Sequence, residues 1–295
     1  MRRELFSSLR FHAEQWLEFS GVNEYNDSVD NIKALAEKRI KMRIVVKVGT
    51  STLTHATGNL NIRRVDKLCR VLSDIKNSGH EVILVTSGAV GMGVGKLSLK
   101  ERPKDIPSKQ AVAAVGQCEL MYTYDRAFSE HNHVIAQILL SAYDVENEER
   151  RHNFHNTIFR LLELGVLPVI NENDTVATEE LAIGDNDTLS AIVAVNAGAD
   201  LLVLLSDIDG LYTADPHRDS SAKLLPEVHG VTPEIIALAG GAGSSLGTGG
   251  MATKLHAAQI VNDAGIDMII TNGADPDVLY KITDGESVGT RFMVR

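Results

Sequence analysis

Residues 44–51 read Ile44-Val45-Val46-Lys47-Val48-Gly49-Thr50-Ser51, an apolar run rich in β-branched residues that ends in glycine and small hydroxyl side chains. Such a run predicts a buried strand that stops at Val48. A lysine inside it is costly unless the charge is paired or used. Further along, Val65-x-x-Leu68-x-x-Val71-Leu72-x-x-Ile75 has helical spacing. Together these segments predict a strand followed by a covering helix.

The same alternation of apolar runs and amphipathic segments continues to the end of the chain. Further strands are expected at Val82–Val85, Val134–Leu139, Val166–Ile170, Leu201–Leu205 and Met268–Ile270, and further helices at about 109–130, 150–164, 187–197 and 252–264. Strands separated by helices predict an α/β fold, in which a mainly parallel open sheet is covered by helices on both faces. The crossovers should be right-handed.

Composition narrows the class of protein. The 295 residues are 44% apolar and 23% charged, which is ordinary for a globular protein, and the net charge of −10 offers no long-range attraction for nucleic acid or an anionic membrane. Cys69 and Cys118 are too few for a disulfide framework or a zinc site, and we expect buried thiols in a reducing cytoplasm. No apolar run approaches the ~18 residues of a membrane span.

Residues 1–41 differ from the rest and are treated as an N-terminal extension. Arg2 and Arg3 suggest a transit peptide, but three glutamates among the first 18 residues argue against it. An amphipathic helix over about 4–19 is expected. The segment is either an accessory element, for example for subunit contact, or a start-site artefact.

Polar and glycine-rich segments follow four of the expected strands. They are Gly49-Thr50-Ser51, Thr86-Ser87-Gly88-Ala89-Val90-Gly91, Asn171-Glu172-Asn173-Asp174 and Ser206-Asp207-Ile208-Asp209-Gly210. Ligands of parallel α/β sheets bind at the carboxyl ends of the strands, so a ligand site is expected there. Gly88 would let the backbone approach an anion at a helix start, although a plain helix capped by Ser87 explains the same residues. The run 91–95, with glycine at every second position, fails the dinucleotide-binding spacing and favours a plain helix turn or loop.

Two further clusters carry charge. Gly184-Asp185-Asn186-Asp187 precedes a helix, and two acids with an amide exceed what a helix cap requires. Gly247-Thr248-Gly249-Gly250-Met251-Ala252-Thr253-Lys254 ends in a lysine, which is either functional or a solvated side chain after the long flexible loop expected at 240–250. Carboxylates near Lys47 and Lys254 can orient both lysines. Two cations beside glycine-rich loops suit phosphoryl transfer, although the chain has no P-loop motif.

Taken together, the motifs resemble those of the amino-acid kinase family. Six segments carry the resemblance, in the family's order and across residues 42–295: Val45–Ser51, Val85–Val90, Pro168–Ala177, Gly184–Ala191, Gly210–Pro216 and Gly247–Lys254. The resemblance implies a three-layer αβα sandwich, with residues 42–295 as the kinase domain. Within the family, the motifs are similar to those of the branch that phosphorylates the γ-carboxylate of L-glutamate with ATP, in the first step of proline biosynthesis.

The resemblance also implies roles for individual residues. Lys47 and Lys254 would neutralise the transferring phosphoryl group, Asp187 would orient both lysines, and Asp185 would assist. Glutamate would be held by Ser87, Gly88, Asn171, Asp174 and Asn186. The nucleotide would be lined by Lys47, Gly49, Ser206, Asp207, Thr248, Gly249, Gly250, Met251, Ala252, Thr253 and Lys254. Mg²⁺ would be carried by the phosphates and water, without a protein ligand.

The same resemblance implies partners. Proline would act as a feedback inhibitor at residues 171–186, the protein would be a homo-oligomer (dimer or tetramer), and it would be coupled to a glutamyl-phosphate reductase. Many bacterial members carry a C-terminal RNA-modification-type (PUA) domain that this chain lacks, so it is either a single-domain form or a piece of a longer protein.

Two other functions stay open. The first is that the chain is a kinase of the same family that acts on N-acetylglutamate, aspartate, carbamate or UMP. The second is that it is an amino-acid-binding regulator that has lost catalysis.

Overall fold

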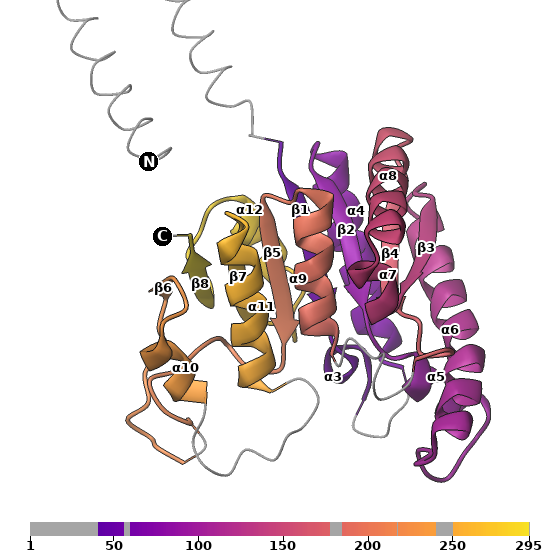
Figure 1. The fold of residues 1–295 in the computed structure, drawn as a ribbon, viewed down its shortest axis with the longest axis horizontal. Coiled ribbons are helices and arrows are strands. Elements are labelled where there is room, and N and C mark those ends of the chain that lie inside the picture. The colour runs from indigo at the N-terminus through magenta and orange to yellow at the C-terminus, as the bar shows by residue number, and fades with distance from the viewer. Residues whose placement is uncertain (1–40, 56–59, 178–184, 217, 240–249, 295) are drawn as a thin grey trace, which may run out of the picture. The chain divides into compact units, whose positions relative to one another are not determined.

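One mixed, mostly parallel sheet organises the computed structural model, which describes residues 41–55, 60–177, 185–216, 218–239 and 250–294 (Figure 1). The strands lie in the order β3-β4-β2-β1-β5-β7-β8-β6. They are β1 (Arg43–Val48), β2 (Glu81–Thr86), β3 (Ile135–Leu140), β4 (Leu167–Glu172), β5 (Leu201–Ser206), β6 (Glu227–His229), β7 (Asp267–Asn272) and β8 (Thr290–Met293). β1 is central and pairs in parallel with β2 and β5.

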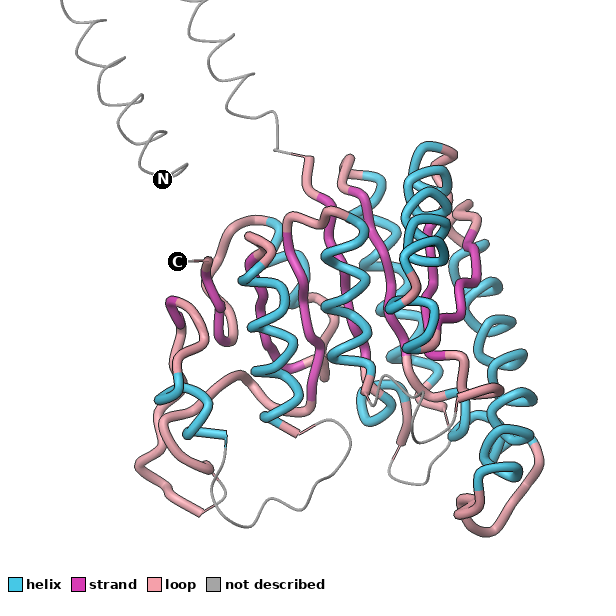
Figure 2. The backbone as a smooth tube through the Cα atoms, viewed as in Figure 1, coloured by secondary structure: helices cyan, strands magenta, loops and turns pink. Residues whose placement is uncertain are grey.

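Helices connect the strands and follow the alternation predicted from the sequence (Figure 2). They are α3 (Thr50–Leu53), α4 (Ile62–Asn77), α5 (Ala89–Lys96), α6 (Ile106–Ser129), α7 (Ala142–Glu146), α8 (Glu148–Glu163), α9 (Asn186–Ala197), α10 (Pro233–Ala239), α11 (Met251–Asp263) and α12 (Val278–Thr283). The run 91–95 lies inside α5, as a plain helix. The helix expected over 4–19 and the loop at 240–249 lie outside the described residues.

Helices cover both faces of the sheet, which confirms the three-layer arrangement. One face packs on α8, α9 and α11, and its core includes Val45, Ile83 and Leu204. The opposite face packs on α4, α6 and α12, and its core includes Val46, Leu84 and Val203. Because neighbouring strand residues point to opposite faces, each central strand contributes to both cores and is mostly apolar.

Two strands at one edge of the sheet, β6 and β8, are not among those expected from the sequence. β8 runs antiparallel to β7, and β6 pairs with β8. β6 has only three residues and β8 only four, with burial that alternates along each of them. Segments this short do not form the continuous apolar run that marks a buried parallel strand.

The structure corrects the expectation that both thiols are buried. Cys69 is buried, but Cys118 is exposed. Cys118 lies on α6, whose buried face carries Gly116, Gln117 and Leu120 instead. Within the part of the chain that the structure describes, no helix is both long enough and apolar enough to cross a membrane.

Candidate active site

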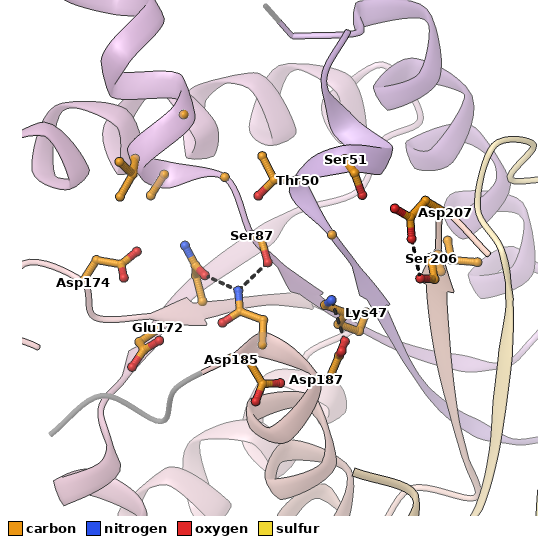
Figure 3. Close-up of a pocket in the computed structure, with 18 of the residues that line it drawn as sticks. Lys47, Thr50, Ser51, Ser87, Glu172, Asp174, Asp185, Asp187, Ser206 and Asp207 are labelled. Atoms are coloured by element: carbon orange, nitrogen blue, oxygen red, sulfur yellow. Dashed lines mark hydrogen bonds and ion pairs between the residues drawn. The ribbon is translucent and has the colours of Figure 1, made fainter. Parts of the chain in front are cut away.

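A pocket of about 500 Å³ lies at the carboxyl ends of β1, β2, β4 and β5. The first turns of α5, α9 and α11 also reach it, through Ala89, Asn186 and Lys254. Figure 3 shows side chains from these strands and loops converging on the same space. The polar segments that the sequence places after separate strands therefore meet at one edge of the sheet.

Lys47 reaches this pocket because of its position in β1. Val46 and Val48 point to the face that packs on α4 and α6. Lys47 therefore points with Val45 to the other face, where α9 and α11 lie. Its neighbours on β2 and β5 are Val85 and Leu204, so the aliphatic stem is enclosed and only 8% of the residue is exposed.

Lys47 and Lys254 meet at a single carboxylate, that of Asp187 on α9. The Nζ atom of Lys47 lies 2.6 Å from Oδ1 of Asp187, and the Nζ atom of Lys254 lies 3.1 Å from Oδ2. Asp187 is fully buried and Lys254 is 5% exposed, so the alternative of a solvated Lys254 is wrong. Burial alone raises the pKa of Asp187, but the two lysines outweigh it and hold that pKa below its ordinary value. The Lys47–Asp187–Lys254 cluster therefore carries two positive charges and one negative charge, and all three side chains are almost completely shielded from solvent.

Asp185, two residues earlier, has a different partner. It is the N-cap of α9, where its Oδ1 accepts a hydrogen bond from the Thr188 backbone N–H at 2.8 Å. Its Oδ2 accepts a second one from the Thr188 hydroxyl at 2.9 Å. Of the two aspartates in this cluster, Asp185 thus caps the helix and Asp187 pairs with the lysines.

Side-chain amides that are hydrogen-bonded to one another lie along the wall of the pocket. Asn186 donates to the Ser87 hydroxyl at 2.7 Å and to the Asn171 side-chain oxygen at 3.0 Å. Asn171 in turn donates to Gln117 on α6 at 2.9 Å. The network joins residues of β4, α6 and α9 with the end of β2, so three of the five expected glutamate-binding residues, Ser87, Asn171 and Asn186, are hydrogen-bonded to one another.

The interpretation of Ser87 as a helix cap is wrong. The N-cap of α5 is Gly88, which has φ 110° and makes no side-chain capping bond. That left-handed conformation favours glycine, and it brings the backbone to the pocket wall. The Ser87 hydroxyl is engaged by Asn186 instead.

Asp174 lies at the end of the pocket away from the lysines (Figure 3). Burial raises the pKa of its carboxyl group, and the positive charge of Arg102 opposes that effect only in part. Glu172 lines the same end. Sequence reasoning assigned no role to Arg102, because it lies in a charged, proline-containing loop that resembles ordinary solvated surface.

The residues expected around a nucleotide are only partly gathered here. Gly49, Ser206 and Asp207 line the pocket, and the Ser206 hydroxyl donates to Asp207 at 3.1 Å. Gly250 is the N-cap of α11 and Met251, Ala252 and Thr253 form its first turn, but of this stretch only Lys254 lines the pocket. The Thr253 hydroxyl contacts Asp187 at 3.2 Å. Thr248 and Gly249 lie outside the described residues.

Comparison with known proteins identifies the family. Residues 42–272 match the model of the family described as "Amino acid kinase family". The chain belongs to the amino acid kinase family. It is 53% identical to the glutamate 5-kinase of Clostridium perfringens (strain 13 / Type A) over 267 residues, which cover 89% of this chain and 98% of the relative. It is 54% identical to that of Clostridium tetani (strain Massachusetts / E88), over 84% of this chain and 93% of the relative.

Solved structures confirm the amino acid kinase fold. The carbamate kinase of Giardia lamblia bound to AMP-PNP aligns with a TM-score of 0.62 at 17% identity, over 87% of this chain and all (100%) of that one. The isopentenyl phosphate kinase of T. acidophilum, as a product complex, aligns with a TM-score of 0.60 at 20% identity, over 85% and 99% of the two chains.

Proposed function

We propose that this chain transfers the γ-phosphoryl group of ATP to the γ-carboxylate of L-glutamate, giving γ-glutamyl phosphate and ADP as the first step of proline biosynthesis. The observation that carries the proposal is the buried Lys47–Asp187–Lys254 cluster at the base of the pocket. Identity above 50% to glutamate 5-kinases over most of the chain supports the choice of glutamate among the acceptors of this family.

In the proposed reaction one bond forms and one bond breaks. A γ-carboxylate oxygen of glutamate bonds to the γ-phosphorus of ATP, while the bond from that phosphorus to the bridging oxygen breaks and ADP leaves with the electron pair. The carboxylate is already ionised at neutral pH, so no general base is needed. The main difficulty is to bring two anions together, and Lys47 and Lys254 lower that repulsion.

The remaining pocket residues position the substrates. Asp174 offers a charge-assisted acceptor for the α-ammonium group of glutamate. Ser87, Asn171 and Asn186 would hold the rest of the molecule, with Gly88 bringing the backbone close. Asp185 supports Asp187 by starting α9. The nucleotide would lie toward Ser206 and Asp207, and the glycine-rich segment that ends in Lys254 would help to bind it.

Mg²⁺ enters the proposal as a companion of ATP. Among the residues that the structure describes, no group of three or more His, Cys, Asp or Glu side chains is arranged to hold a metal ion. In this proposal the cation is carried by the phosphate oxygens of ATP and by water, and no protein ligand is assigned to it.

The wider context is proposed in the same way. Residues 42–295 form the kinase domain, and residues 1–41 are an extension. The protein is a cytoplasmic homo-oligomer that works beside a glutamyl-phosphate reductase, and proline inhibits it through the segment 171–186. Proline that leaves turnover unchanged at low glutamate would reject the last point.

Trapping with hydroxylamine tests the reaction, because hydroxylamine converts acyl phosphates to hydroxamates. We expect ATP- and Mg²⁺-dependent hydroxamate from L-glutamate but not from N-acetylglutamate or aspartate. Signal from another acid alone would overturn the substrate. ATP binding without turnover of any acid would favour the regulator instead.

Lysine variants test the site. Lys47→Ala and Lys254→Ala should each lower kcat by at least about a hundredfold, the scale of losing one electrostatic transition-state contact. Lys96→Ala is the matched control, because Lys96 is an exposed lysine paired with Glu119 and does not line the pocket. Unchanged turnover in both site variants would reject the proposed roles.

A further inference from the structure

Three cationic side chains line the pocket among the described residues: Lys47, Lys254 and Arg102. The first two share Asp187. Arg102 makes no hydrogen bond or ion pair within the part of the chain that the structure describes, and its side chain is exposed. It stands in the loop between α5 and α6, a loop held at its end by Asp105, which caps α6 through the Ser108 backbone N–H.

Arg102 lies on the acidic side of the pocket. Its charge acts on the buried carboxyl group of Asp174, and Glu172 and Asp185 line the pocket as well. The two oppositely charged groups of Arg102 and Asp174 influence each other without forming a salt bridge. Within the described residues neither side chain has a hydrogen-bond or salt-bridge partner, and space between such a guanidinium and carboxylate suits a ligand that carries both charges itself, such as the α-ammonium and α-carboxylate of an amino acid.

The charges of the substrate favour a cation at this end of the pocket. Glutamate has a carboxylate at each end and one ammonium group beside the α-carboxylate. With the γ-carboxylate directed to Lys47 and Lys254, the α-carboxylate would face Asp174 and Glu172, which repel it. Among the described residues that line the pocket, Arg102 is the remaining cationic side chain that can attract it. A guanidinium group matches a carboxylate with two parallel hydrogen bonds.

We propose that Arg102 binds the α-carboxylate of the amino-acid substrate and makes the pocket selective for substrates in which that carboxylate is free. This inference rests on the proposed function, since it names the group that recognises the end of glutamate that does not react. Arg102 acts on binding more than on the transfer step, because in this arrangement it holds the α-carboxylate and not the γ-carboxylate that reacts.

The test compares the full chain with Arg102→Ala and with Lys104→Ala in the hydroxamate assay. Lys104 is the matched control, an exposed cation two residues further along the same loop that does not line the pocket. We expect Arg102→Ala to raise the KM for glutamate by about 10- to 100-fold, the scale of a charged hydrogen-bonded contact, with kcat within about twofold. Lys104→Ala should leave both constants near those of the wild type.

A second substrate isolates the α-carboxylate. The α-amide of glutamate keeps the ammonium and the γ-carboxylate but is neutral where Arg102 is expected to bind. Arg102→Ala should leave kcat/KM for this amide unchanged, so that the preference for glutamate over the amide falls by the factor that glutamate loses. Arg102→Lys should recover part of the preference. If the amide is not turned over at all, the comparison of the KM for glutamate between Arg102→Ala and Lys104→Ala tests the inference.

Several outcomes would overturn the inference: an equal loss with glutamate and its amide, an equal effect of Lys104→Ala, or a fall in kcat at unchanged KM. The wild type distinguishes the two levels of the argument. Wild-type protein without activity on glutamate rejects the proposed function together with the inference. Active wild type with any of the three outcomes rejects the role of Arg102 alone.

Discussion

At the scale of single residues, the site depends on a buried carboxylate between two lysines. Asp187 has no exposed surface, and a charge in such a place is tolerated because Lys47 and Lys254 both contact it. Removal of either lysine leaves one ion pair, whereas removal of Asp187 leaves two buried cations side by side. The carboxylate of Asp187 therefore fixes where the ammonium groups of both lysines lie.

Asp174 leads to a prediction about pH. Its pKa is raised, so as pH falls this carboxyl group becomes protonated at a pH above the ordinary value of about 3.9. Neutral Asp174 cannot form an ion pair with the ammonium group of glutamate. The KM for glutamate should therefore rise as pH is lowered toward the raised pKa of Asp174, over a range of pH in which the carboxylates of the substrate itself are still mostly ionised.

The matched variant for this pH experiment is Asp174→Asn, which should have a high KM that does not change over the same range. Steady-state hydroxamate kinetics at several pH values measure both proteins. A wild-type KM that is flat with pH, or an Asn variant with the wild-type profile, would contradict the proposed role of Asp174.

At the scale of elements, the two aspartates at the start of α9 have different functions: Asp185 caps the helix and Asp187 pairs with the lysines. Asp185→Ala should lower the free energy of unfolding by about 0.5–2 kcal/mol, because it removes the acceptor for the Thr188 backbone N–H. Asp185→Asn keeps an acceptor oxygen and should be close to wild type, as measured by urea unfolding. Equal destabilisation by both substitutions would show that the charge, and not the cap, is what matters.

The contact between α5 and α6 makes a second element-scale prediction. A Cβ atom at Gly116 would lie 1.7 Å from the Ala89 carbonyl oxygen and 2.3 Å from the Gly93 backbone nitrogen. Gly116→Ala should therefore force the helices apart and cost at least about 1–3 kcal/mol of unfolding free energy. Because Ala89 and Gly88 line the pocket, the KM for glutamate should rise as well.

Gly95→Ala is the control for this substitution. Gly95 also lies in α5, but a Cβ atom there would meet nothing within 4 Å. Alanine is a better helix former than glycine, so this variant should be as stable as the wild type or up to about 1 kcal/mol more stable. Thermal unfolding of the two variants gives the comparison, and equal stability of both would refute the close packing.

At the scale of the whole molecule, the C-terminal strand β8 connects the edge strand β6 to the rest of the sheet. β8 is inserted between β7 and β6, and the Thr290 hydroxyl accepts from the Leu211 backbone N–H at 2.8 Å while it donates to the Leu225 carbonyl at 2.6 Å. Phe292 on this strand is fully buried in the core that also contains α9 and α11. The C-terminal strand is therefore part of the framework that supports Asp187 and Lys254.

Phe292→Ala should lower the free energy of unfolding by about 3–5 kcal/mol, the usual cost of removing a buried phenylalanine ring. Val294→Ala is the control, because Val294 follows directly after β8 and is 37% exposed. Urea denaturation measures both. A Phe292→Ala protein as stable as Val294→Ala would mean that this edge of the sheet does not contribute to the core.

The main strands and helices could be predicted because each is long and regular. β1, β2, β4 and β5 are mostly apolar, and the helices between them repeat their apolar residues at helical spacing. The short β6 and β8 could not be predicted in the same way, since a few residues carry no clear period. Their pairing depends on the neighbours that the rest of the chain supplies.

The amino-acid sequence by itself determined the α/β class, the order of the main elements and the placement of polar segments after the strands, because local periodicity and glycine-rich turns are properties of short segments. Only the tertiary structure decided that Lys254 is buried against Asp187 rather than solvated, that Ser87 bonds Asn186 rather than capping α5, and that Arg102 reaches the pocket. These contacts join residues that are far apart in the chain, and they exist only when sheet register and helix packing bring those residues together.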